Sequence, residues 1–136
     1  MKRPEPGILI VITGPTATGK TRLAACVAAQ CEGEVISADS RQVYRGMDLG
    51  TGKDLHDFMV GNTLVPYHLI DIAEPGYEYN VFEFQQDFFK AHSHIRKRNK
   101  QPILCGGTGL YIEVALKAYP LQKVDPNPEL RENLQL

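Results

Sequence analysis

The chain has 136 residues, of which 43% are hydrophobic and 23% are charged, and its formal net charge is −1 at pH 7. This composition is typical of one globular domain and excludes a disordered or fibrous chain. The near-neutral balance also excludes the overall positive field by which nucleic-acid-binding domains usually attract their ligand.

The residues at the N-terminus run directly into an apolar stretch that is too short for a signal peptide or a membrane span. The three cysteines, Cys26, Cys31 and Cys105, lack the spacing of metal ligands. We expect them to be small buried thiols in a reducing compartment. The sequence therefore predicts a cytoplasmic protein that does not associate with a membrane.

Apolar runs and helical stripes alternate along the chain. Strands are predicted at residues 8–13, 35–37, 67–72 and 103–105, helices at 21–31, 81–98 and 109–118, and a loop at 46–64. Because helices separate most of the strands, we expect an α/β fold whose sheet is parallel and has helices on both faces.

The helix at 81–98 has the clearest pattern. An Asn80/Glu83 capping box precedes it, and its apolar face is expected to lie in the core. This face consists of Val81, Phe84, Phe88, Ala91 and Ile95. The basic run at 96–100 suits the negative end of the helix dipole, which we favour over a role in nucleic-acid binding.

Residues 14–21 match the phosphate-binding loop G-x-x-x-x-G-K-[ST] at each fixed position: Gly14, Pro15, Thr16, Ala17, Thr18, Gly19, Lys20 and Thr21. Glycines let the backbone wrap a phosphate at the start of a helix, where N–H groups and the helix dipole favour negative charge. Lys20 adds a positive charge, and Thr21 offers a hydroxyl to Mg²⁺. The loop predicts a P-loop NTPase-like fold that binds a diphosphate, without naming the reaction.

Three further segments narrow the reaction, namely residues 35–53, 67–71 and 106–111. Together with the loop, they resemble the tRNA dimethylallyltransferase family, also called tRNA isopentenyltransferases, over about residues 7–119. The resemblance implies transfer of the dimethylallyl group from dimethylallyl diphosphate to N6 of the adenosine on the 3′ side of the tRNA anticodon. The loop would then hold the diphosphate leaving group, and no ATP would be consumed.

Asp39 is the predicted general base, because it follows the strand at 35–37 and is expected at the carboxyl edge of the sheet. Adenine N6 is a weak nucleophile, so its attack on an allylic carbon needs a base that takes a proton as the bond forms. The resemblance implies the same role. Two other roles stay open for Asp39, which are capping the next short helix and holding Mg²⁺ through water.

Lys20 and Thr21 complete the predicted catalytic set. The charge of Lys20, together with Mg²⁺ held by the Thr21 hydroxyl, is expected to stabilise the departing diphosphate. Thr21 is the one residue that we predict to be a metal ligand.

The resemblance also implies contacts with tRNA from Asp39, Ser40, Arg41, Gln42 and Thr108. The target base would have to flip out of the anticodon loop to reach Asp39. For Arg41 and Arg45 a solvated charged turn is the alternative to phosphate contacts, and for Thr108 the alternative is a helix N-cap.

Members of the family that this chain resembles are roughly twice as long as the chain or longer. We therefore expect a P-loop core domain at 1–119, which contains the diphosphate site, and at 120–136 the start of a truncated helical insertion or linker. The fragment is expected to be monomeric and weakly active or inactive. The rival functions are an isopentenyltransferase that uses free adenylate, a P-loop small-molecule kinase, and a binding module.

Overall fold

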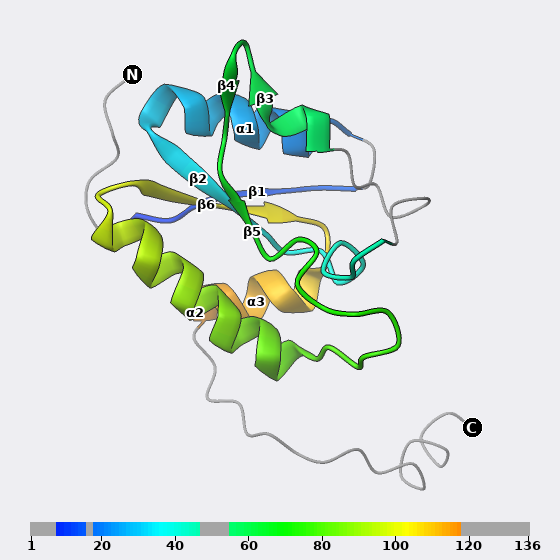
Figure 1. Cartoon of the computed structure of the whole chain (residues 1–136). Helices are drawn as coiled ribbons and strands as arrows, with labels where there is room; N and C mark the ends of the chain where they lie inside the picture. Colours follow the sequence, from blue (N-terminus) through cyan, green and yellow to red (C-terminus); the bar gives the residue numbers. More distant parts are fainter. Residues whose placement is uncertain (1–7, 16–17, 47–54, 118–136) are drawn as a thin grey trace, which may run out of the picture.

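The computed structural model describes residues 8–15, 18–46 and 55–117, and the structural statements below concern these ranges. A parallel sheet with strand order β1-β6-β2-β5 lies between α1 on one face and α2 and α3 on the other (Figure 1). The strands are β1 (Ile10–Thr13), β2 (Gly33–Ser37), β5 (Tyr67–His68) and β6 (Gln101–Gly106), and the helices are α1 (Lys20–Cys31), α2 (Val81–Lys97) and α3 (Gly109–Lys117). The predicted parallel sheet with helices on both faces is confirmed.

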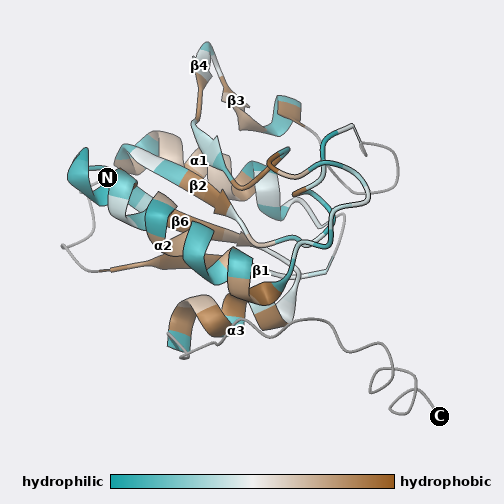
Figure 2. Ribbon diagram, turned by 60° about the horizontal axis from the view of Figure 1, so that its bottom comes forward, coloured by the Kyte–Doolittle hydropathy of each residue, from teal (hydrophilic) through white to brown (hydrophobic). Residues whose placement is uncertain are grey.

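The two central strands, β2 and β6, are buried at every position. Successive side chains of a strand point to opposite faces of the sheet, so each strand contributes to two cores. Val35 and Ile103 pack on the α1 side, whereas Ile36 and Leu104 pack on the side of α2 and α3. In Figure 2 part of each of these strands is brown, whereas the outward side of α2 is mostly teal.

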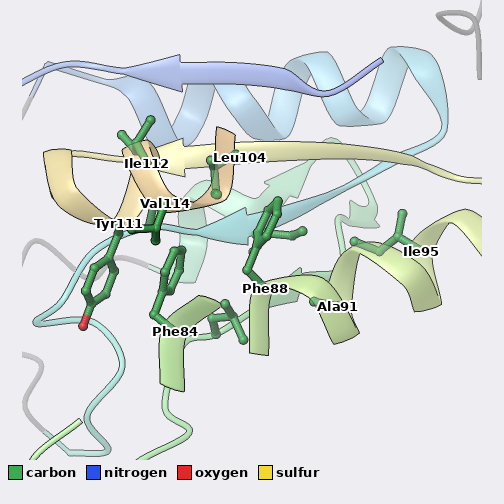
Figure 3. Close-up of a cluster of buried hydrophobic side chains, with 12 residues drawn as sticks. Phe84, Phe88, Ala91, Ile95, Leu104, Tyr111, Ile112 and Val114 are labelled. Carbon is green, nitrogen blue, oxygen red and sulfur yellow. The ribbon is translucent and has the colours of Figure 1, made fainter. Parts of the chain in front are cut away.

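The core between the sheet and α2 is built around aromatic rings (Figure 3). Phe84 stacks on Tyr111 with the ring centroids 4.2 Å apart, and its centroid lies 6.2 Å from that of Phe88. Of the predicted apolar face, Phe84, Phe88, Ala91 and Ile95 are buried, and Val81 is partly buried against them. The core assignment of the phenylalanines is therefore confirmed.

The start of α2 also agrees with the sequence. The N–H of Glu83 donates to Asn80 Oδ1 at 2.8 Å, and Asn80 is the N-cap residue. This bond satisfies one of the backbone donors that a helix leaves without a partner in its first turn.

The loop predicted at 46–64 is wrong for residues 55–64. These residues form a 3₁₀ turn, η1 (Leu55–Phe58), and an antiparallel hairpin of β3 (Met59–Val60) and β4 (Thr63–Leu64). Gly61, the first residue of the two-residue hairpin turn, has a φ of 61°, which glycine adopts without strain.

The strand predicted at 67–72 is too long, since β5 ends at His68. Leu69 and Asp71 have φ values of 66° and 58°, which lie outside the extended region. Residues 47–54 and the expected insertion at 120–136 lie outside the described residues.

A buried carboxylate lies at the amino edge of the sheet. Glu34 is 2% exposed, and its Oε1 lies 2.8 Å from His68 Nε2 while its Oε2 accepts a hydrogen bond from the Arg98 guanidinium. Arg98 is the C-cap residue of α2, within the predicted basic run. The charge of Arg98 therefore compensates a buried anion and ties α2 to β2.

Replacing Arg98 with Met is expected to lower the free energy of unfolding by about 1–3 kcal/mol, because the Glu34 carboxylate stays buried without its cationic partner. The estimate is kept low because solvent screens the half-exposed arginine. Lys97→Met is the matched control, since it removes the same charge from the same helix end. Urea denaturation of both variants measures the difference, and equal losses would assign the effect to the helix dipole instead.

Candidate functional site

The carboxyl ends of the parallel strands meet at one edge of the sheet, where doubly wound folds bind their ligands. β1 leads into the phosphate loop, β2 leads into residues 38–46, and β6 leads into residues 107–108. The register pairs Thr13 with Gly106 and Ser37 with Cys105, so the three segments begin at the same level. The structure thus brings together the predicted loop, Asp39 and Thr108.

The start of α1 has no hydrogen bond from a capping side chain. Its N-cap residue is Gly19, with a φ of 84° that glycine adopts without strain. Lys20 Nζ donates to the carbonyl oxygen of Pro15 at 3.1 Å, and Thr18 Oγ1 donates to the same oxygen at 2.8 Å. The N–H groups at this end of the helix, with the lysine folded back over the loop, suit an anionic ligand.

Two glycines at the end of β6 let the neighbouring segments approach closely. A Cβ atom on Gly106 would lie 2.3 Å from the carbonyl oxygen of Ala38. A Cβ atom on Gly107 would lie 3.2 Å from the carbonyl oxygen of Gly14 and 3.9 Å from Lys20 Nζ. The backbone of β6 therefore packs directly against both the Asp39 segment and the phosphate loop.

Asp39 is 8% exposed and caps its own turn. Its Oδ1 accepts the N–H of Arg41 at 2.9 Å, and Arg41 Nε lies 3.8 Å from the same oxygen. The short helix that the capping alternative expected is a turn in the structure, and Asp39 caps this turn through one of its two carboxylate oxygens. A role in proton transfer is compatible with it and remains a proposal.

Thr108 is bonded to both neighbours of Asp39. Its N–H donates to the carbonyl oxygen of Ala38 at 3.1 Å, and its Oγ1 accepts the N–H of Ser40 at 3.0 Å. The first residues after β2 and β6 are thereby joined across the sheet edge.

Cys105, the residue before Gly106 in β6, pairs with Ile12 of β1 and Ser37 of β2, the strands that lead into the phosphate loop and into Asp39. The pKa of its thiol is raised to about 11, chiefly by burial; Asp39 adds to the rise, and the Lys20 charge and a hydrogen bond from Thr21 oppose it. Lys20, Thr21 and Asp39, the three predicted catalytic residues, therefore all affect this thiol. The sequence had indicated only a small buried side chain at this position, because an apolar strand pattern does not show which loops surround its end.

Arg45 is held within the protein. Its Nε donates to the carbonyl oxygen of Asp71 at 2.8 Å, and its Nη1 lies 2.6 Å from Glu74 Oε1. Gln42 Oε1 accepts the Ser37 hydroxyl at 3.1 Å. These contacts favour the charged-turn interpretation for Arg45.

Sequence reasoning missed Tyr111 as a neighbour of the site. The pKa of Tyr111 is raised to about 12, chiefly by burial and also by Tyr44 and Asp39. Tyr111 stands in the first turn of α3, two residues after the glycine-rich segment. Its position in the Gly-Gly-Thr-Gly-Leu-Tyr run was a usable signal, since a first-turn residue of that helix lies close to the sheet edge.

Two of the predicted loop residues, Thr16 and Ala17, lie outside the described residues. In the described ranges, no group of three or more His, Cys, Asp or Glu side chains could hold a metal ion. No helix in the same part of the chain has the length and apolar character needed to cross a membrane.

Two family models together match residues 7–136. The one described as IPP transferase matches residues 42–136, and the one described as isopentenyl transferase matches residues 7–65. The chain therefore belongs to the IPP transferase family.

Curated relatives carry the name tRNA dimethylallyltransferase. The relative from Parabacteroides distasonis is 63% identical over 127 residues, and the one from Geotalea daltonii is 60% identical over 126 residues. Each alignment covers 93% of this chain, but only 41% and 40% of the respective relative. The chain thus spans about two fifths of the length of these relatives, as the sequence had suggested.

Solved structures agree with this assignment. The full-length tRNA isopentenylpyrophosphate transferase from Bacillus halodurans has a TM-score of 0.78 and 42% identity, covering 93% of this chain and 41% of that one. A eukaryotic dimethylallyltransferase acting on tRNA has a TM-score of 0.76 and 29% identity, covering 93% and 32%. The predicted P-loop NTPase-like fold class is confirmed.

Gly106→Ala is expected to lower the free energy of unfolding by about 1–3 kcal/mol, because the added Cβ would overlap the Ala38 backbone and force the two segments apart. Gly109→Ala is the control, since a Cβ there meets nothing within 4 Å. Urea denaturation compares the two variants. A Gly106→Ala protein as stable as the control would contradict the close backbone packing.

Cys105 is expected to resist alkylation by iodoacetamide at pH 8, whereas the less buried Cys26 reacts first. Folding raises the pKa of Cys105 from 9.0 to about 11, so its contribution to stability is complete below pH 9 and is lost as the pH rises through 11. Peptide mapping by mass spectrometry identifies the modified thiols. Rapid labelling of native Cys105 at pH 8 would argue against its burial.

Proposed function

We propose that this chain is the catalytic core of a tRNA dimethylallyltransferase, which transfers the dimethylallyl group from dimethylallyl diphosphate to N6 of the adenosine beside the anticodon. The observation that carries the proposal is the position of Asp39. Gly106 packs against Ala38, the residue before Asp39, and the next residue, Gly107, lies beside Gly14 and Lys20, so the proposed base and the phosphate loop flank the same end of β6.

Asp39 and the phosphate loop have separate roles in the proposed reaction. As the bond between adenosine N6 and the allylic carbon forms, the bond from that carbon to the diphosphate oxygen breaks. The proton of N6 passes to Asp39, and the electron pair of the broken bond leaves with the diphosphate. Lys20, the α1 N-terminus and the loop formed by Gly14, Pro15, Thr16, Ala17, Thr18 and Gly19 bind the leaving group and stabilise its charge.

Mg²⁺ is the proposed cofactor, and the hydroxyl oxygen of Thr21, next to the loop lysine, is a ligand of the kind that this ion prefers. Mg²⁺ is commonly bound by one or two protein oxygens together with substrate phosphates. The Thr21 hydroxyl, in the first turn of α1, would supply the protein ligand. When bound, the ion would neutralise charge on the diphosphate.

The acceptor is proposed to be the anticodon loop of tRNA, met by Ser40, Arg41, Gln42 and Thr108 beside Asp39. The names of the relatives support this acceptor over a free adenylate. We further propose a cytoplasmic monomer, with the P-loop core at 1–119 and a helical insertion or linker beginning at 120–136.

Calorimetry with dimethylallyl diphosphate and Mg²⁺ tests the donor half of this function. The chain is expected to bind the prenyl diphosphate more tightly than ATP. Lys20→Ala is expected to lose about tenfold or more in affinity, because a charge-assisted contact to phosphate is removed.

Lys90→Ala is the control for this measurement, since Lys90 is exposed on α2, away from the loop. A preference for ATP that depends on the γ-phosphate would favour a small-molecule kinase. Equal binding by wild type and Lys20→Ala would remove the phosphate loop from the proposed mechanism.

A further inference from the structure

Asp39 is held from both sides by a single residue of the neighbouring strand end. Thr108 donates its N–H to Ala38, the residue before Asp39, and accepts the N–H of Ser40, the residue after it, at 3.1 Å and 3.0 Å. Because Asp39 is 8% exposed, the path of its backbone determines where its carboxylate lies.

The hydroxyl of Thr108 is engaged as both donor and acceptor. Besides accepting the Ser40 N–H, Oγ1 donates to Ser40 Oγ at 3.4 Å. The carbonyl oxygen of Thr108 accepts the N–H of Ile112 at the start of α3. The side chain therefore bonds across the sheet edge instead of capping its own helix.

Backbone packing fixes the end of β6, the strand that precedes Thr108. The N–H of Ala38 donates to the carbonyl oxygen of Cys105 at 2.8 Å, and Gly106 leaves no room for a Cβ against Ala38. Thr108 therefore follows a closely packed strand end. The later part of the turn after β2 is held by backbone bonds of residues 42–45 to residues 71–73, whereas Ser40 is bonded to Thr108.

We infer that Thr108 is a positioning residue of the proposed transfer reaction, whose backbone N–H and hydroxyl hold residues 38–40 so that the Asp39 carboxylate stays beside the phosphate loop. The inference rests on the proposed function. It gives the Thr108 hydroxyl an effect on the rate through Asp39, in addition to the proposed contact of Thr108 with tRNA.

Thr108→Val preserves the shape and the backbone N–H of the residue but removes the acceptor for Ser40. In the full-length transferase, kcat is expected to fall about 10- to 100-fold, because a displacement near 1 Å of a reacting group can cost about 10²-fold. KM for tRNA is measured separately, because loss of the proposed tRNA contact alone would raise KM and leave kcat unchanged. Thr108→Ser keeps the hydroxyl and is expected to restore most of kcat.

A double-mutant cycle with Asp39→Asn separates the two roles of the hydroxyl. Asp39→Asn alone is expected to lower kcat by about 10²- to 10⁴-fold, as for loss of a general base. Adding Thr108→Val is expected to cause no further loss. The inference would be overturned if the double variant lost kcat by the product of the two single effects, or if Thr108→Val raised KM and left kcat unchanged. Thr108 would then act independently of Asp39.

The controls distinguish this result from failure of the proposed function. An active wild-type enzyme that tolerates Asp39→Asn would contradict the proposed base, whatever Thr108 does. Thr63→Val makes the same substitution on the exposed β4 and is expected to keep the wild-type kcat. Thr108→Val is expected to bind dimethylallyl diphosphate like wild type in calorimetry, and loss of that binding would also overturn the inference by showing a general disturbance of the sheet edge.

Discussion

The close backbone contact between the ends of β2 and β6 is the constraint on which the site depends. Gly106 permits it, since any side chain there would occupy the position of the Ala38 carbonyl group. The contact brings the turn after β2 to within hydrogen-bonding distance of Thr108, and it leaves Gly107 beside the phosphate loop. A parallel sheet provides the common edge, but this glycine sets how tightly the three loops converge.

The charged side chains at the two edges of the sheet have different kinds of partner. At the amino edge, the buried Glu34 carboxylate is matched by His68 and Arg98, so its charge is compensated within the fold. At the carboxyl edge, the described contact of Lys20 Nζ is the carbonyl oxygen of Pro15, which carries no net charge. An anionic ligand can supply that compensation, which is a physical reason to expect binding at the second edge rather than the first.

Much of the candidate site could be predicted because its residues follow one another in local motifs. The phosphate loop is a strand, a glycine-rich turn and a helix in direct succession, and Asp39 and Thr108 each follow an apolar strand. Contacts between distant segments could not be predicted in this way. The pairing of Arg45 with Glu74 and the place of Cys105 beneath the loop depend on which strands are neighbours, and one sequence without relatives does not specify strand order.

The sequence by itself determined the alternation of strands and helices, the core face of α2 and the phosphate-binding character of the turn before α1, because each follows from spacing within a short segment. The tertiary structure decided that Thr108 bonds to Ser40 across 68 residues of chain, and that Arg98 compensates Glu34 instead of only facing a helix dipole. Those partners meet through the packing of separate elements. Their free energy therefore depends on burial and distance in the folded state, which local patterns do not contain.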